Sequence, residues 1–227
     1  MKTLRSIIIA VITGAAISAS ADTYSFNFTN NFANGGVIPD GNLTGWSVTR
    51  ALSGITDLAI TDVNVSLNIS GGFNGDLYAY LAHDSGFSVL LNRPGRPDGF
   101  GFGYGDAGLN ITLDDAAALG DIHTYQTMAG YATLISNGSG WSPDGRNVNP
   151  LTVLGTDSRL NLLDQFHGLN PNGDWTLFVA DVSTGAEATL VSWGLSITAV
   201  PVVPEPSCLA LGILGALALC CRRADKH

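Results

Sequence analysis

The stretch Val63-Asn64-Val65-Ser66-Leu67-Asn68-Ile69 decides the fold, because apolar and polar residues alternate strictly along it. A period of two places the aliphatic side chains on one face of a β-strand and the Asn and Ser side chains on the other. The residues 24–28 alternate in the same way, as Tyr-Ser-Phe-Asn-Phe. Other apolar segments of strand length lie at 77–81, 89–91, 109–113, 175–182 and 190–197.

Turn-forming clusters separate these segments, among them Ser70-Gly71-Gly72, Asp84-Ser85-Gly86 and Asn170-Pro171-Asn172-Gly173. Many short strands with regular turn signals predict an all-β domain, either an antiparallel β-sandwich or a jelly roll. Only 114–119 shows a helical pattern, and it is brief. We find no internal repeat of fixed period.

The N-terminus has the layout of a secretory signal peptide. Lys2 and Arg5 form a short positive region, an apolar run follows at 7–17, and Ala19-Ser20-Ala21 offers small residues for cleavage. The alternative is a membrane anchor, but the run is shorter than the ~20 apolar residues that a span needs. We therefore expect residues 1–21 to be removed and the chain to be exported.

The C-terminus carries a second apolar run, at 208–221. Val203-Pro204-Glu205-Pro206 precedes it and Arg222-Arg223 follows it at once. Positive residues beside an apolar run favour a transmembrane segment with a cytoplasmic end. A buried core helix is the alternative. We expect 201–227 to form a motif, a membrane-spanning run and a basic tail.

The remaining domain, 22–200, is strongly acidic. It contains seventeen Asp and Glu residues, five arginines and no lysine, which gives a net charge of −12. Nucleic acid is an unsuitable partner, because phosphate binding needs a basic face. All three cysteines (Cys208, Cys220 and Cys221) lie in the tail, so the domain has no internal disulfide and must be stabilised by burial.

Several motifs resemble, in order and spacing, those of the P domain of proprotein convertases, also called the P/Homo B domain. The resemblance covers roughly 37–199. The early motifs are Ile38-Pro39-Asp40, the strand at 60–69, the Gly75-Asp76-Leu77 step and the turn at 84–86. The later motifs are the segment 111–117, with Ala116 where the family often has Glu, then Phe166-His167-Gly168, 173–181 and 192–197.

This resemblance implies a jelly-roll-like β-sandwich of the galactose-binding-like type. In convertases the P domain lies beside a subtilisin-like catalytic domain and stabilises it. The printed chain has no length for such a catalytic domain, so we expect no protease activity. The resemblance is also compatible with an accessory module that assists an exported protease.

The tail resembles the PEP-CTERM sorting signal of Gram-negative bacteria, on Val203-Pro204-Glu205-Pro206, the apolar run and Arg222-Arg223. The resemblance implies recognition by an exosortase, a membrane protease-transpeptidase, in bacteria that make extracellular polysaccharide. We therefore expect an inner-membrane intermediate, and then a cell-surface or extracellular protein.

The sequence offers little for catalysis. Asp84-Ser85-Gly86 has the form of one aspartic-protease half-site, but no second copy exists to share a proton with it. His83, His123 and His167 are isolated, and no G-x-S-x-G motif occurs. We expect the domain not to be an enzyme.

Asp76, Asp174 and Asp181 are candidate calcium ligands, because each begins or ends an apolar strand and hard oxygen donors suit that ion. The alternative is that these carboxylates accept backbone N–H groups and fix turns. No EF-hand loop is present. Calcium is the only cofactor that the sequence suggests.

Aromatic residues in Gly-rich and Asn-rich loops are candidate ligand contacts. They are Phe100, Phe102, Tyr104 and Trp141. Exposed rings there would stack on sugar faces, and the alternative is that they fold back over the sandwich. Trp175 and Trp193 lie in predicted strands and are expected in the core. The sequence thus predicts a surface or matrix protein without catalysis, or alternatively a module that binds a glycan or an exported protease.

Overall fold

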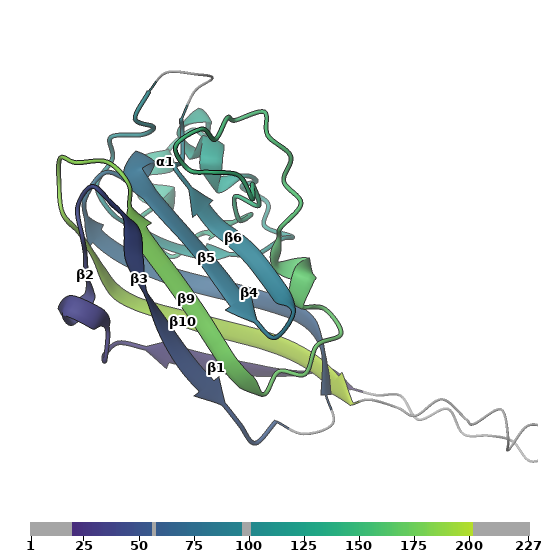
Figure 1. Cartoon of the computed structure of the whole chain (residues 1–227). Helices are drawn as coiled ribbons and strands as arrows, with labels where there is room; N and C mark the ends of the chain where they lie inside the picture. The colour runs from purple at the N-terminus through teal and green to yellow at the C-terminus, as the bar shows by residue number, and fades with distance from the viewer. Residues whose placement is uncertain (1–19, 56–57, 97–100, 202–227) are drawn as a thin grey trace, which may run out of the picture.

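The computed structural model describes residues 20–55, 58–96 and 101–201. Two β-sheets pack face to face in this part of the chain, with short helices and long loops at one end (Figure 1). The predicted signal peptide (1–21) lies outside the described residues except for residues 20 and 21, and the predicted sorting segment (201–227) does so except for residue 201. Among the helices in these ranges, none has the length and apolar character that a membrane span requires.

The larger sheet is built on two long strands, β4 (Leu58–Gly71) and β10 (Ala188–Pro201), which pair antiparallel. Its order is β1-β10-β4-β7-β8, and β2 also pairs with β10. The shorter members are β1 (Asp22–Phe28), β2 (Val37–Ile38), β7 (Leu109–Leu113) and β8 (Gly140–Trp141). Only β7 and β8 pair in parallel among these described strands.

The smaller sheet is fully antiparallel, in the order β3-β9-β5-β6. Its strands are β3 (Asn42–Leu52), β5 (Leu77–His83), β6 (Gly86–Asn92) and β9 (Gly173–Asp181). Antiparallel pairing has a consequence for the site: the start of β3, the end of β9 and the start of β5 meet at one end of the sheet. That end carries the cleft described below.

The core between the sheets is apolar, as the alternation predicts. Val63, Val65, Leu67 and Ile69 of β4 are each at most 2% exposed, whereas Asn64 and Asn68 between them are only partly buried. Trp175 and Trp193 are fully buried, which confirms the expectation from their strands. Burial on this scale, at roughly 25 cal/mol per Å² of apolar surface, replaces the disulfides that the domain lacks.

Short helices fill the loops: η1 (Ala33–Gly36), η2 (Asn74–Asp76), η3 (Ile122–Thr127), α1 (Tyr131–Leu134) and η4 (Leu163–Phe166). The helix predicted at 114–119 is wrong. Asp114 Oδ1 accepts the backbone N–H of Ala116 at 2.7 Å and turns the chain there. The Asp84-Ser85 turn is confirmed as the two-residue connection of the β5–β6 hairpin, with Asp84 at φ 49°.

Candidate functional site

Three carboxylates gather where the smaller sheet ends. Asp181, the last residue of β9, pairs with Asn42 of β3 on one side and with Leu77 of β5 on the other. Asp76 therefore lies beside it, one residue before β5. Asp40 precedes β3, and its carboxylate accepts the backbone N–H of Gly185 from the β9–β10 loop. The topology thus brings together residues that are 36 and 105 positions apart in sequence.

Arg93, directly after β6, holds this end of the sheet together. Its guanidinium donates to Asp76 Oδ1 at 3.1 Å and to Ser183 Oγ at 3.1 Å. It also donates to the carbonyls of Gly75 at 2.9 Å and Phe102 at 3.3 Å. Burial raises the pKa of Asp76 and lowers the pKa of Arg93, in each case against the attraction of the partner's charge. Burial thus opposes the charged form of both partners, and the ion pair with its hydrogen bonds offsets part of that cost.

Asp181 is a buried carboxylate with an unused oxygen. The residue is fully buried, and Oδ2 has no hydrogen-bond partner within the described part of the chain. Oδ1 accepts a long bond, 3.4 Å, from the Ser183 N–H. Burial, aided by the charges of Asp76 and Asp40, raises the pKa of Asp181 to about 6. Its ionised form is therefore costly at neutral pH.

The segment 101–105 lies along one side of this end of the sheet, where its backbone comes close to that of Gly75. The N–H of Gly75 donates to the Tyr104 carbonyl at 2.8 Å, and the Tyr104 N–H donates to the Pro94 carbonyl at 2.9 Å. A Cβ on Gly75 would lie 2.4 Å from both the Phe102 carbonyl oxygen and the Tyr104 nitrogen. Glycine is required at 75 because the two backbones touch there.

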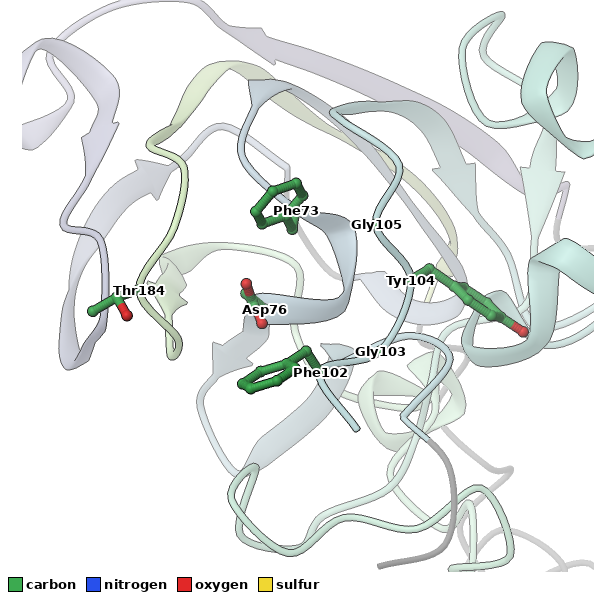
Figure 2. A pocket seen from close by; sticks show the side chains of 7 residues that line it. All are labelled: Phe73, Asp76, Phe102, Gly103, Tyr104, Gly105 and Thr184. Atoms are coloured by element: carbon green, nitrogen blue, oxygen red, sulfur yellow. The ribbon is translucent and has the colours of Figure 1, made fainter. Parts of the chain in front are cut away.

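A cleft of about 290 Å³ opens beside Asp76, which is the one of these three carboxylates that lines it. Phe73 and Phe102 flank it, and the carboxylate of Asp76 lies between them with Thr184 opposite (Figure 2). The Phe102 side chain is 77% exposed and Phe73 is 39% exposed. Two accessible rings around a carboxylate and a hydroxyl form an apolar site with few polar groups, which is typical of a small-ligand site.

The structure separates the four aromatic residues that the sequence suggested. Phe102 alone among the described ones presents its ring to the cleft; Phe100 lies outside the described residues. Tyr104 contributes backbone, while its ring points away and packs edge-on against Tyr125 at 4.6 Å between centroids (Figure 2). Trp141 is fully buried, because β8 pairs with β7 and places it in the core. The sequence around Trp141 is irregular and rich in Asn, and it gives no sign of the two-residue pairing between β8 and β7.

Sequence reasoning missed two side chains of the cleft, Thr184 and the aromatic Phe73. Phe73 follows Gly71-Gly72, and a turn was the obvious interpretation there. The ring packs against Gly185 of the β9–β10 loop, where a Cβ would lie 3.0 Å from it. The available signal was a large apolar residue placed within a glycine-rich turn, where no strand could bury it.

The three candidate calcium ligands do not form one site. Asp174 is the second residue of β9 and Asp181 the last, and seven positions along an extended strand separate their Cα atoms by about 23 Å. Asp76 already pairs with the guanidinium of Arg93. Within the described ranges, no group of three or more His, Cys, Asp and Glu side chains is placed to hold a metal ion. The residues present therefore do not fit a calcium ion bound by this trio.

The contacts of the two buried histidines, His83 and His123, support the fold. His83 bonds the carbonyls of Asn170 and Asp174 and stacks on Trp175 at 4.0 Å. His123 Nδ1 lies 2.7 Å from Asp144 Oδ2, and both residues are buried. His167 is exposed.

A buried ionic network around Asp144 was not anticipated from the sequence. Arg146 bonds Asp144 at 3.1 Å and Asp121 at 2.8 Å, and Arg159 donates to Ser142 Oγ at 2.7 Å. The N–H groups of Asp144 and of the following Gly145 bond the carbonyls of Leu90 and Val89 in β6. The network thus fixes a long loop along the edge of the smaller sheet.

Comparisons with known proteins give no family. No family model matches the sequence, and no curated protein matches it. Among solved structures, the serine protease of Aeromonas sobria is similar at 15% identity with a TM-score of 0.42, and the complex of that protease with the chaperone ORF2 at 15% with 0.41. Each match covers 79% of this chain and 27% of the other. The chain thus spans about a quarter of the length of these proteins, and likeness at this level carries no information on activity.

Proposed function

We propose that this chain is an exported, non-catalytic β-sandwich that binds polysaccharide at the cell surface or in the extracellular matrix. The observation that carries the proposal is the cleft between Phe73 and Phe102, with Asp76 and Thr184 between the rings. Aromatic ring faces stack on the apolar faces of sugars. A carboxylate accepts hydrogen bonds from sugar hydroxyls, and a hydroxyl both accepts and donates them.

The floor of the cleft is suited to binding because it is preorganised. Arg93 ties η2, the 101–105 segment and the β9–β10 loop to one guanidinium. The backbone contact of Gly75 with 102–104 fixes the height of Phe102 above the sheet. A rigid floor reduces the entropy lost on binding, which favours affinity from a small contact area.

The absence of catalysis is part of the same proposal. A histidine base needs a free ring nitrogen near a nucleophile and the substrate. Both ring nitrogens of His83 lie next to backbone carbonyl oxygens, at 3.0 and 2.7 Å, and His123 is only 1% exposed. Neither histidine lines the cleft.

Delivery rests on the ends of the sequence. We propose that the signal peptide directs export and that an exosortase cuts near Pro204-Glu205-Pro206, with the domain folded as a P/Homo B-like jelly roll. Intact mass spectrometry of the protein from its native bacterium tests this. A chain from Asp22 to near Pro206 is expected. A mass that retains 207–227 overturns the processing step.

The binding proposal is tested by titrating the purified full-length protein with the extracellular polysaccharide of its bacterium. Phe102→Ala is expected to weaken binding about tenfold, since it removes one stacking ring. Leu160→Ala is the matched control, because Leu160 is similarly exposed, at 73%, and does not line the cleft. Equal binding by both variants and the parent overturns the assignment of the cleft. Co-purification with a subtilisin-like protease, without glycan binding, favours the accessory-module alternative instead.

A further inference from the structure

The cleft has an excess of negative charge at its base. Asp76 lines it, Asp181 lies buried beside Asp76, and Asp40 is near enough to raise the pKa of both. Arg93 is the one described cation that bonds to this group; Arg96 donates instead to the Pro150 carbonyl at 3.0 Å. Among the described residues, three carboxylates thus share one guanidinium, and Asp40 and Asp181 accept backbone N–H groups rather than pairing with a cation of their own.

The second feature is the unused oxygen of Asp181. A fully buried carboxylate oxygen with no hydrogen-bond partner costs stability, and native structures rarely contain one without a reason. Arg93 bonds Asp76 rather than Asp181. Asp181 also attracts Arg93, but it lies beside Asp76, and its charge adds to that of Asp76 in favouring a positive group in the cleft.

The third feature is the pair of phenyl rings. The rings of Phe73 and Phe102 lie on either side of the carboxylate of Asp76 (Figure 2). The face of a phenyl ring is electronegative and attracts an organic cation within about 6 Å of its centre. Rings and carboxylates thus favour the same kind of ligand, a compact ammonium group attached to an apolar or sugar-like body.

We propose that the group bound between Phe73 and Phe102 is the protonated amine of an amino sugar, presented by a deacetylated stretch of polysaccharide. The proposal rests on the proposed function and specifies its ligand. A volume of about 290 Å³ is at the lower limit for ligand pockets, about 300 Å³, and suits a single sugar unit. The amine lies against Asp76, and its ring stacks on Phe102.

The test compares two oligosaccharides of equal length, one of glucosamine and one of N-acetylglucosamine, by calorimetry on the full-length protein at about pH 6.5 to 7, above the pKa of Asp181. The glucosamine oligomer is expected to bind at least about thirtyfold more tightly, which is the usual effect of a desolvated charge partner. Its affinity is also expected to fall with added salt. Equal affinity overturns the amine proposal and leaves glycan binding intact. No binding of these or of the native polysaccharide overturns the proposed function itself.

Two variants locate the charge. Asp76→Asn is expected to abolish the preference for glucosamine, and Asp174→Asn, at the opposite end of β9, to retain it. If Asp76→Asn does not fold, Asp181→Asn serves instead, since it leaves the lining of the cleft unchanged and removes one buried charge. A preference that survives both cleft variants overturns the proposal. A lysine-rich peptide is the third arm: tight binding of the peptide without binding of the glucosamine oligomer shows that the amine comes from protein and overturns the amino-sugar assignment.

Discussion

Replacing Asp181 by Asn is expected to make the protein more stable at pH 8. The carboxylate is fully buried, and its pKa rises from 3.8 to about 6. That rise corresponds to a penalty on the order of 3 kcal/mol for the ionised form well above pH 6. The amide carries no charge but leaves its own N–H groups to be satisfied. We therefore expect a net gain of about 1–2 kcal/mol in the free energy of unfolding.

The sign of the pH dependence follows from the same shift. Between pH 3.8 and about 6 the folded state keeps a proton on Asp181 that the unfolded state has lost. This group therefore lowers stability as pH rises through that window, and the penalty remains at higher pH. The advantage of Asp181→Asn over the parent is expected to be largest at pH 8 and to shrink as pH falls through 6 towards 4.

Urea unfolding of both proteins at pH 8 and pH 5 measures the effect, with Asp174→Asn as the exposed control on the same strand. That control is expected to stay within about 0.5 kcal/mol of the parent at both pH values. A destabilised Asp181→Asn at pH 8, or a stability difference from the parent that does not change with pH, refutes the reasoning. Carboxylates elsewhere titrate in both proteins, so the difference isolates position 181.

Three further outcomes follow from particular contacts. Gly75→Ala is expected to displace the 101–105 segment at a cost of about 1–3 kcal/mol and to abolish polysaccharide binding, as measured by urea unfolding and calorimetry; unchanged binding contradicts the close backbone contact. Arg146→Met is expected to cost about 3–5 kcal/mol, because it leaves the buried carboxylate of Asp144 without its guanidinium; thermal unfolding checks it, and a loss under 1 kcal/mol contradicts the network. Leu81→Ala is expected to cost about 2–5 kcal/mol in the same assay and to leave the ligand preference unchanged.

Much of the sandwich was predictable, because burial on one face of a strand leaves a strict alternation in the sequence. The 109–113 strand was predicted with the bounds of β7, and the long strands were found with ends a few residues short. The strand β3 was missed. It lies at the sheet edge, contains Gly45 and Arg50, and buries only part of one face, so its alternation is weak.

The site was predictable only in its parts. Asp76, Asp181 and Phe102 were named from the sequence, but no local pattern shows that the end of β9 meets the start of β5. That is a property of strand pairing over about 100 residues. Trp141 was misplaced for the same reason, since its burial depends on the short pairing of β8 with β7. Phe73 carried no signal beyond its odd position in a turn.

Hydrogen–deuterium exchange of the full-length protein, with and without the native polysaccharide, tests the cleft most directly. Protection is expected at 73–76, 101–105 and 183–185, the segments around the rings and Asp76, with 148–160 unchanged. Protection confined to other segments, such as the exposed loop around Leu160, or no protection under saturating polysaccharide, would contradict the assignment of the Phe73–Phe102 cleft as the binding site.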